Sequence, residues 1–161
     1  MIKSFNTILF LTFLLSQTWE PVHHKELINH QNDIINFSKI DSTAFIYTPQ
    51  LRTTRALSHR IIGYLPYWQY SYYPALDYSL LTEINYFSAE LNEQGNIIND
   101  HNWSNLELVS FAHEFNVKVK LCATLFGSAS LTTLLENSIY RQNAINNLLE
   151  LVQVMGADGV D

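Results

Sequence analysis

The sequence predicts an α/β protein that forms the N-terminal half of a (β/α)8 TIM barrel, with the barrel incomplete in this chain. From residue 60 onward, strand-like runs alternate with helix-like runs, which is typical of parallel βα units. No G-x-G-x-x-G motif follows the first strand, so a dinucleotide-binding sheet lacks its main support. A full barrel needs about 250 residues, and only about 100 follow residue 59. We therefore expect three complete strands and the start of a fourth.

The first predicted strand covers residues 60–65, and Pro66 ends it because proline cannot donate to a strand ladder. A loop rich in Tyr and Trp follows, up to Tyr73. The second strand covers residues 83–91 and stops at a turn around Gly95. The third strand covers residues 117–125. Its alternation places Val119, Leu121 and Ala123 on one face and Lys118, Lys120, Cys122 and Thr124 on the other.

Two helices are expected between these strands. Ser104 and Glu107 form a capping-box pattern, S-x-x-E, ahead of apolar residues at helical spacing. Residues 138–155 form an amphipathic helix, and Gly156 suits the position just after its end. The apolar stripe of that helix consists of Ile145, Leu148, Leu149 and Val152. The fourth strand would begin at Asp158.

Composition restricts the partners of the chain. The 161 residues are 47% hydrophobic and 13% aromatic, so the bulk of the chain should fold. The net charge is −6, with only 9 Lys and Arg residues and no basic stripe, which excludes nucleic acid as a partner. An uncharged ligand fits this balance better. The single Cys122 cannot form an intrachain disulfide.

The N-terminus is predicted to be a signal peptide, residues 1–18, which directs the protein to the periplasm or outside the cell. Lys3 precedes an apolar run, residues 8–15, that is too short to span a bilayer. An uncleaved anchor is the alternative, and no other membrane contact is expected. Residues 19–58 are predicted to be a linker or pre-domain segment with one short helix around residues 25–35. His23, His24 and His30 lie close together there, but they lack evenly spaced partners, so no metal site is expected.

The last residues of the chain, Asp158, Gly159, Val160 and Asp161, look like the opening of a row of acids on a strand. Residues two apart on a strand share a face. In a run D-G-x-D-x-D-x-E, the second Asp, the third Asp and the Glu therefore point the same way. Neighbouring like charges raise the pKa of one member, which can then protonate a leaving group. Only the first two acids are present, and D-G alone is also a common turn.

Four segments together resemble glycoside hydrolase family 18, the chitinase-like barrels. Residues 62–68, Ile-Gly-Tyr-Leu-Pro-Tyr-Trp, look like the family's first strand, and residues 82–88 are similar to its second. Residues 117–121 and 124–127 stand where the family carries S-x-G-G, although the paired glycines are missing. Either Cys122 or Thr124 could hold the place of the family serine. Residues 156–161 stand where it carries D-G-x-D-x-D-x-E.

The resemblance implies a partial catalytic domain over residues 59–161. It would hydrolyse β-1,4-linked N-acetylglucosamine glycans with assistance from the substrate, without metal or cofactor. Asp158 and Asp161 would be supporting acids, and Tyr64, Tyr67 and Trp68 would contact the carbohydrate. The general-acid Glu and the Asp that orients the acetamido group would follow Asp161. Residues 1–161 alone are therefore expected to be inactive.

Two other interpretations remain open. The chain could belong to a non-catalytic carbohydrate-binding relative that keeps the aromatic cleft, or be an inactive truncated product. It could also be an unrelated α/β domain in which D-G-V-D occurs by chance. The sequence does not predict an oligomeric state.

Overall fold

The computed structural model describes residues 20–38 and 59–161. The chain divides into two compact units, residues 1–32 and 33–161. The described part of the first unit contains helix α2 (Val22–His30), slightly earlier than the helix predicted around residues 25–35. The predicted signal peptide lies outside the described residues, as does much of the predicted linker.

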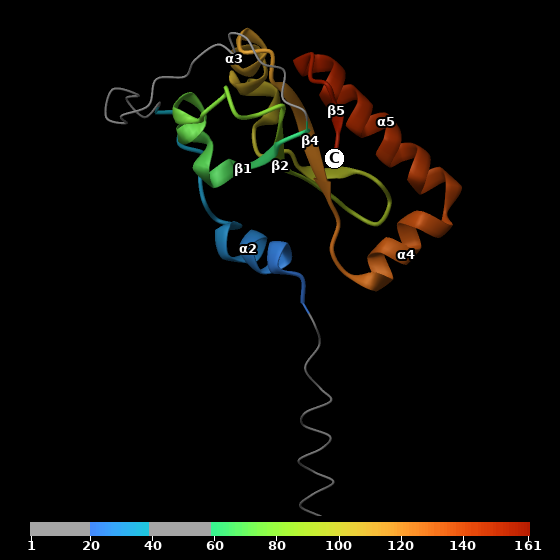
Figure 1. The fold of residues 1–161 in the computed structure, drawn as a ribbon. Coiled ribbons are helices and arrows are strands. Elements are labelled where there is room, and N and C mark those ends of the chain that lie inside the picture. The colour runs from blue at the N-terminus through green and yellow to red at the C-terminus, as the bar shows by residue number, and fades with distance from the viewer. Residues whose placement is uncertain (1–19, 39–58) are drawn as a thin grey trace, which may run out of the picture. The chain divides into compact units, whose positions relative to one another are not determined.

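The second unit is built on a sheet of four parallel strands in the order β1-β2-β4-β5 (Figure 1). The strands are β1 (Ile62–Pro66), β2 (Glu83–Leu91), β4 (Lys118–Thr124) and β5 (Gly159–Val160). Each parallel strand is added beside the preceding one, as in a (β/α)8 barrel, and the described strands do not close into a ring. The α/β fold class and the incomplete barrel are thus confirmed. A short strand that the sequence did not predict, β3 (Ile97–Asn99), pairs with β2 in the antiparallel direction.

The two faces of this sheet differ in chemistry, as the alternation along the third predicted strand indicated. One face carries fully buried apolar side chains and packs beneath helices such as α3 (Leu108–Glu114). These side chains are Ile84, Tyr86, Val119 and Leu121. The register pairs Glu83 with Lys118, Asn85 with Lys120 and Phe87 with Cys122 on the other face. This second face is the inner wall of the incomplete barrel.

The segments on either side of β2 contain two 3-10 helices. The predicted aromatic loop forms η2 (Tyr67–Ala75), and η3 (Trp103–Asn105) precedes α3. The predicted capping box is wrong. Ser104 lies inside η3, and α3 begins after Glu107 with no side-chain cap. The amide N–H of Glu107 instead donates to the phenol oxygen of Tyr70 at 2.9 Å.

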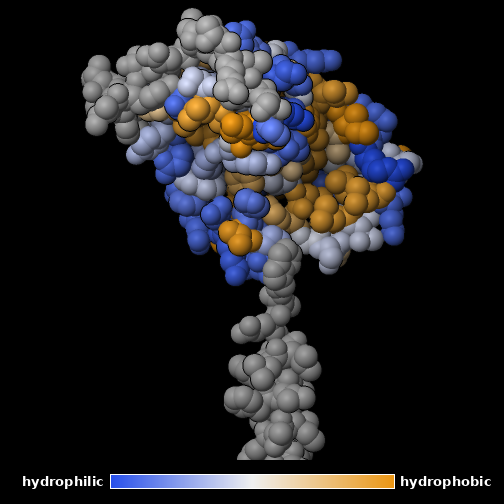
Figure 2. Space-filling model, viewed as in Figure 1, coloured by the Kyte–Doolittle hydropathy of each residue, from blue (hydrophilic) through white to orange (hydrophobic). Residues whose placement is uncertain are grey.

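Helices α4 (Ser128–Glu136) and α5 (Ser138–Met155) lie along the β5 side of the sheet (Figure 1). The bounds of α5 are those predicted. The Asn137 side chain accepts from the first-turn amides, and Gly156 ends the helix at φ 64°. Leu134 of α4 and Ala144 of α5 pack with Leu91. Part of the predicted stripe of α5 is not covered, since Ile145 and Leu149 are about half exposed. Apolar side chains accordingly gather over α4 and α5 in Figure 2.

Candidate active site

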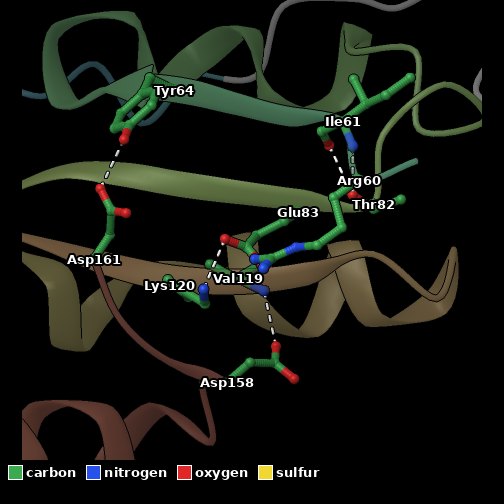
Figure 3. Close-up of polar contacts among 9 residues, drawn as sticks. All are labelled: Arg60, Ile61, Tyr64, Thr82, Glu83, Val119, Lys120, Asp158 and Asp161. Atoms are coloured by element: carbon green, nitrogen blue, oxygen red, sulfur yellow. Dashed lines mark hydrogen bonds and ion pairs between the residues drawn. The ribbon is translucent and has the colours of Figure 1, made fainter.

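The candidate site lies where the parallel strands end, because the carboxyl ends of parallel strands meet at one edge of the sheet. Tyr64 comes from β1, Asp161 follows β5, and Tyr67 and Trp68 open η2 directly after β1. Figure 3 shows Tyr64 and Asp161 together at one end of the strands, and Glu83 and Asp158 toward the other end.

Tyr64 and Asp161 face each other across the inner wall. The Tyr64 hydroxyl donates a hydrogen bond of 2.8 Å to Oδ2 of Asp161 (Figure 3). This bond favours the neutral phenol and raises the pKa of Tyr64 above its usual value. The backbone of Asp161 continues the ladder, donating to the Leu121 carbonyl at 2.9 Å and accepting from the Ala123 amide at 3.0 Å. The carboxylate is therefore fixed both by its own strand and by a phenol from β1.

Cys122 lies on β4 beside the Asp161 carboxylate. Burial, followed by the charge of Asp161 and the contact with it, raises the pKa of the Cys122 thiol to about 12. Thr124, the other candidate for the place of the family serine, pairs its hydroxyl with that of Ser88 at 3.0 Å. The residue that stands next to Asp161 is therefore Cys122.

Asp158 lies apart from Asp161, at the amino end of β5. Its Oδ2 accepts from the Val119 amide at 2.8 Å and lies 2.8 Å from Nε2 of His113 on α3. Burial by itself would raise the pKa of Asp158, but the hydrogen bonds from His113 and Val119 outweigh it, so the pKa is lowered. The structure thus gives His113 a partner that the sequence did not indicate. Asp158 ties the start of β5 to β4 and α3.

Tyr67 and Trp68 differ in accessibility. Tyr67 is fully buried, and its ring stacks on His101 with centroids 3.6 Å apart. Burial, with the nearby charge of Glu90, raises the pKa of Tyr67 to about 12. Trp68 is partly exposed and touches Tyr67 and Phe87 edge-on, with centroids 4.8 Å and 6.0 Å away. In this arrangement the buried Tyr67 ring packs against Trp68, and part of the Trp68 side chain stays accessible to a ligand.

A charged cluster fills the inner wall below the candidate site. The Glu83 carboxylate is nearly buried and lies 2.6 Å from Arg60 and 2.8 Å from Lys120 (Figure 3). Burial would raise the pKa of Glu83, but these two cations outweigh it and lower the pKa. The Asn85 amide is fully buried and has no hydrogen-bond partner by distance and angle among the described residues. Of this cluster, the alternation in the sequence assigned only Lys120 to this face, and it did not predict the pairing with Glu83.

A cavity of about 370 Å³ opens beside this cluster, lined by Arg60, Thr82, Glu83, Lys118, Lys120 and Asp158. It lies toward the amino ends of the strands, away from Asp161, so it is not the candidate site. Within residues 20–38 and 59–161, no three His, Cys, Asp or Glu residues are grouped to hold a metal ion. None of the described helices is long and apolar enough to cross a membrane.

No protein-family model matches this sequence, and no curated protein matches it either. Solved structures do match. A chitinase from Bacteroides thetaiotaomicron is similar with a TM-score of 0.55 and 25% identity, over 63% of this chain and 34% of that chain. A glycoside hydrolase family 18 chitinase from Flavobacterium johnsoniae gives a TM-score of 0.53 and 19% identity, over 63% and 35%. A family 18 chitinase from Cycas revoluta, in complex with (GlcNAc)3, gives a TM-score of 0.51 and 20% identity, over 62% of this chain and 32% of that chain.

These neighbours confirm the resemblance found in the sequence. The fold of the described chain is that of a partial chitinase-like domain of the glycoside hydrolase family 18 type. The match spans about a third of the length of these neighbours.

Proposed function

We propose that this chain forms the first half of the catalytic domain of a secreted or periplasmic glycoside hydrolase, covering residues 59–161. In its full-length form the enzyme would cleave β-1,4-linked N-acetylglucosamine glycans such as chitin. The observation that carries the proposal is the Asp161 carboxylate, held by the Tyr64 phenol at 2.8 Å at the carboxyl edge of a chitinase-like sheet. Substrates and active sites of (β/α)8 enzymes lie at that edge.

The chemistry follows from the substrate's own acetamido group. Its oxygen attacks the anomeric carbon, so the protein supplies one acid for the leaving oxygen and carboxylates that orient the acetamido group. Asp161 would be the first inward acid of the row, and its negative charge would help the next acids to keep a proton. Asp158 would support the row from behind, because it fixes the start of the strand that carries Asp161.

Carbohydrate binding would use the exposed aromatic surface beside Asp161. Tyr64 is 56% exposed, and Trp68, four residues later at the same edge, is partly exposed. Aromatic rings offer an apolar face to sugar C–H groups while a polar tip stays hydrated. The Cycas revoluta chitinase in complex with (GlcNAc)3 supports an N-acetylglucosamine oligomer as the ligand to test.

A non-catalytic carbohydrate-binding relative is the second candidate. The family's paired glycines are missing in either register: their positions hold Phe126 and Gly127 if Thr124 takes the serine's place, and Thr124 and Leu125 if Cys122 does. The cleft floor therefore differs from the family's pattern. Such a protein would keep Trp68 and Tyr64 but lack the acid that donates the proton.

Reading the gene past Asp161 separates these candidates. We expect Asp at the second following residue and Glu at the fourth. Titration of the protein from its own full reading frame with N-acetylchitotriose, followed by calorimetry, should then show binding that weakens in Trp68→Ala. A non-acid at the fourth position, with binding retained, would favour the binder. No binding at all by the folded protein would overturn both candidates.

A further inference from the structure

The side chains of Glu90 and His101 form a close polar contact at the carboxyl end of β2, and the roles proposed above do not use it. Glu90 is the penultimate residue of β2, and its Oε1 lies 2.7 Å from Nε2 of His101. The His101 side chain is 6% exposed, while that of Glu90 is 24% exposed. The pair therefore consists of a buried imidazole and a carboxylate that reaches the surface.

The register of the sheet places Glu90 at the edge where the candidate site lies. Beyond a register shift between Phe87 and Ala89, Glu90 pairs with Thr124, the last residue of β4. Three successive contacts then link it to Trp68. Glu90 contacts His101, the His101 ring stacks on Tyr67, and Tyr67 touches Trp68.

His101 is held rigidly, and so is the carboxylate it contacts. The backbone amide of His101 donates to Oδ1 of Asn99 at 3.0 Å, and the His101 carbonyl accepts from the Tyr86 hydroxyl at 2.9 Å. Its ring lies parallel to that of Tyr67, at an angle of 8°. The backbone and ring of His101 are thus held in place, and His101 in turn holds the Glu90 carboxylate. A binding group must be preorganised in this way.

The second oxygen of this carboxylate is available to a ligand. Oε1 of Glu90 is engaged by His101, and Oε2 makes no hydrogen bond to any residue in the described part of the chain. A carboxylate whose one oxygen is fixed offers the other as a strong acceptor for hydroxyl groups. Sugar hydroxyls are donors of this kind, and the partly exposed Trp68 can cover an adjacent sugar face.

We propose that Glu90 binds a hydroxyl group of the carbohydrate through Oε2, with His101 as the residue that positions it. This inference rests on the proposed carbohydrate function and adds a polar contact to the aromatic surface of Trp68. The competing explanation is that the pair only closes the hairpin between β2 and β3. In that case its loss would change stability and not affinity.

The test is a calorimetric titration with N-acetylchitotriose of the protein expressed from its own full reading frame. Glu90→Ala should weaken binding about tenfold or more, because a hydrogen bond to a charged group is lost. Glu93→Ala is the matched control. It removes a carboxylate from the same hairpin, where Oε1 of Glu93 accepts from the side chain of its neighbour Gln94, and it should change the dissociation constant less than twofold. His101→Phe keeps a ring on Tyr67, frees the carboxylate, and should weaken binding less than Glu90→Ala does.

A second measurement does not depend on the variants being folded. In the wild-type protein, the carboxylate ¹³C resonance of Glu90 should move on saturation with N-acetylchitotriose, whereas that of Glu93 should not. Unchanged affinity in folded Glu90→Ala, or a stationary Glu90 resonance while the sugar binds, would overturn the inference alone. Failure of the wild-type protein to bind would instead overturn the proposed function.

Discussion

Tyr64 and Asp161 are 97 positions apart in the sequence, yet the phenol of one donates to the carboxylate of the other at 2.8 Å. Their strands, β1 and β5, are separated by β2 and β4 in the sheet. Side chains stand roughly perpendicular to a sheet, so two side chains three strands apart would not meet across a flat one. The hydrogen bond therefore requires a strongly curved sheet with Tyr64 and Asp161 on its concave wall, which is the geometry of a barrel.

Asp161→Asn should lower the pKa of Tyr64 toward its usual value. The hydrogen bond to the carboxylate is the main cause that raises this pKa, and a neutral amide favours the neutral phenol less. The measurement is a pH titration of the Tyr ¹³Cζ resonances by NMR. Asp158→Asn is the control, because Asp158 contacts Val119 and His113. An unchanged Tyr64 titration in Asp161→Asn would show that the two side chains do not meet in solution.

Asp158→Asn should destabilise the fold by about 1–2 kcal/mol at neutral pH, because hydrogen bonds to a charged group are lost. The folded-state pKa of Asp158 lies below its unfolded value. The stabilisation is therefore complete above the unfolded pKa, near 3.9, and is lost as the pH falls through the lower folded pKa. Urea denaturation of both proteins from pH 7 to pH 3 measures this. A stability difference that stays constant over the range would contradict the role given to the ionised carboxylate.

Lys120→Met should destabilise the protein by about 2–3 kcal/mol, because it leaves the nearly buried Glu83 with Arg60 alone. Lys118→Met is the matched control, since Lys118 lies two residues away on β4 and is exposed. It should cost less than about 0.5 kcal/mol, as surface substitutions usually do. Equal effects of the two substitutions in chemical denaturation would mean that the Glu83 pair is not a specific stabiliser.

Cys122 should resist thiol reagents while the protein is folded. With a pKa of about 12, very little of the thiol is ionised at pH 8, and the residue is only 8% exposed. Dithionitrobenzoate should react at least about a hundredfold faster in 6 M guanidinium than in buffer. The chain has one cysteine, so the stoichiometry is unambiguous. Rapid labelling of the folded protein would show that β4 and the Asp161 region open readily.

The parts of the fold that sequence patterns predict are those with strong local signals. Strand β2 and helix α5 have the predicted bounds. Ile84, Tyr86 and Phe87 favour a strand and a turn follows β2, while an Asn cap and a terminal Gly delimit α5. Helix α4 was missed because its run of Ser and Thr is a weak helix former. Strand β3 was missed because it is only three residues long. The capping box failed because the chain reaches α3 through a 3-10 turn.

The candidate site could be predicted only in part, since side-chain pairing between strands depends on curvature and register. The alternation of side chains along a strand places Asp158 and Asp161 on opposite faces, because they are three residues apart. This alternation does not reveal that His113 forms a hydrogen bond with Asp158 or that Tyr64 donates one to Asp161. The resemblance left Cys122 and Thr124 as alternatives, and the register shift at Ser88 places Thr124 against the Ser88 hydroxyl. Glu90 and His101 gave no local signal at all.

The most direct test of the chitinase-like function is release of a chromophore from an aryl chitobioside. We predict turnover by the protein from its full reading frame and none by residues 1–161, because we place the general acid after Asp161 and such an acid contributes about 10²–10⁴-fold by itself. Tyr64→Phe in the longer protein should reduce the rate about tenfold through a misplaced Asp161, since small losses of orientation are costly. Turnover by residues 1–161 at a rate near that of the longer protein would place the acid within this chain and contradict the account.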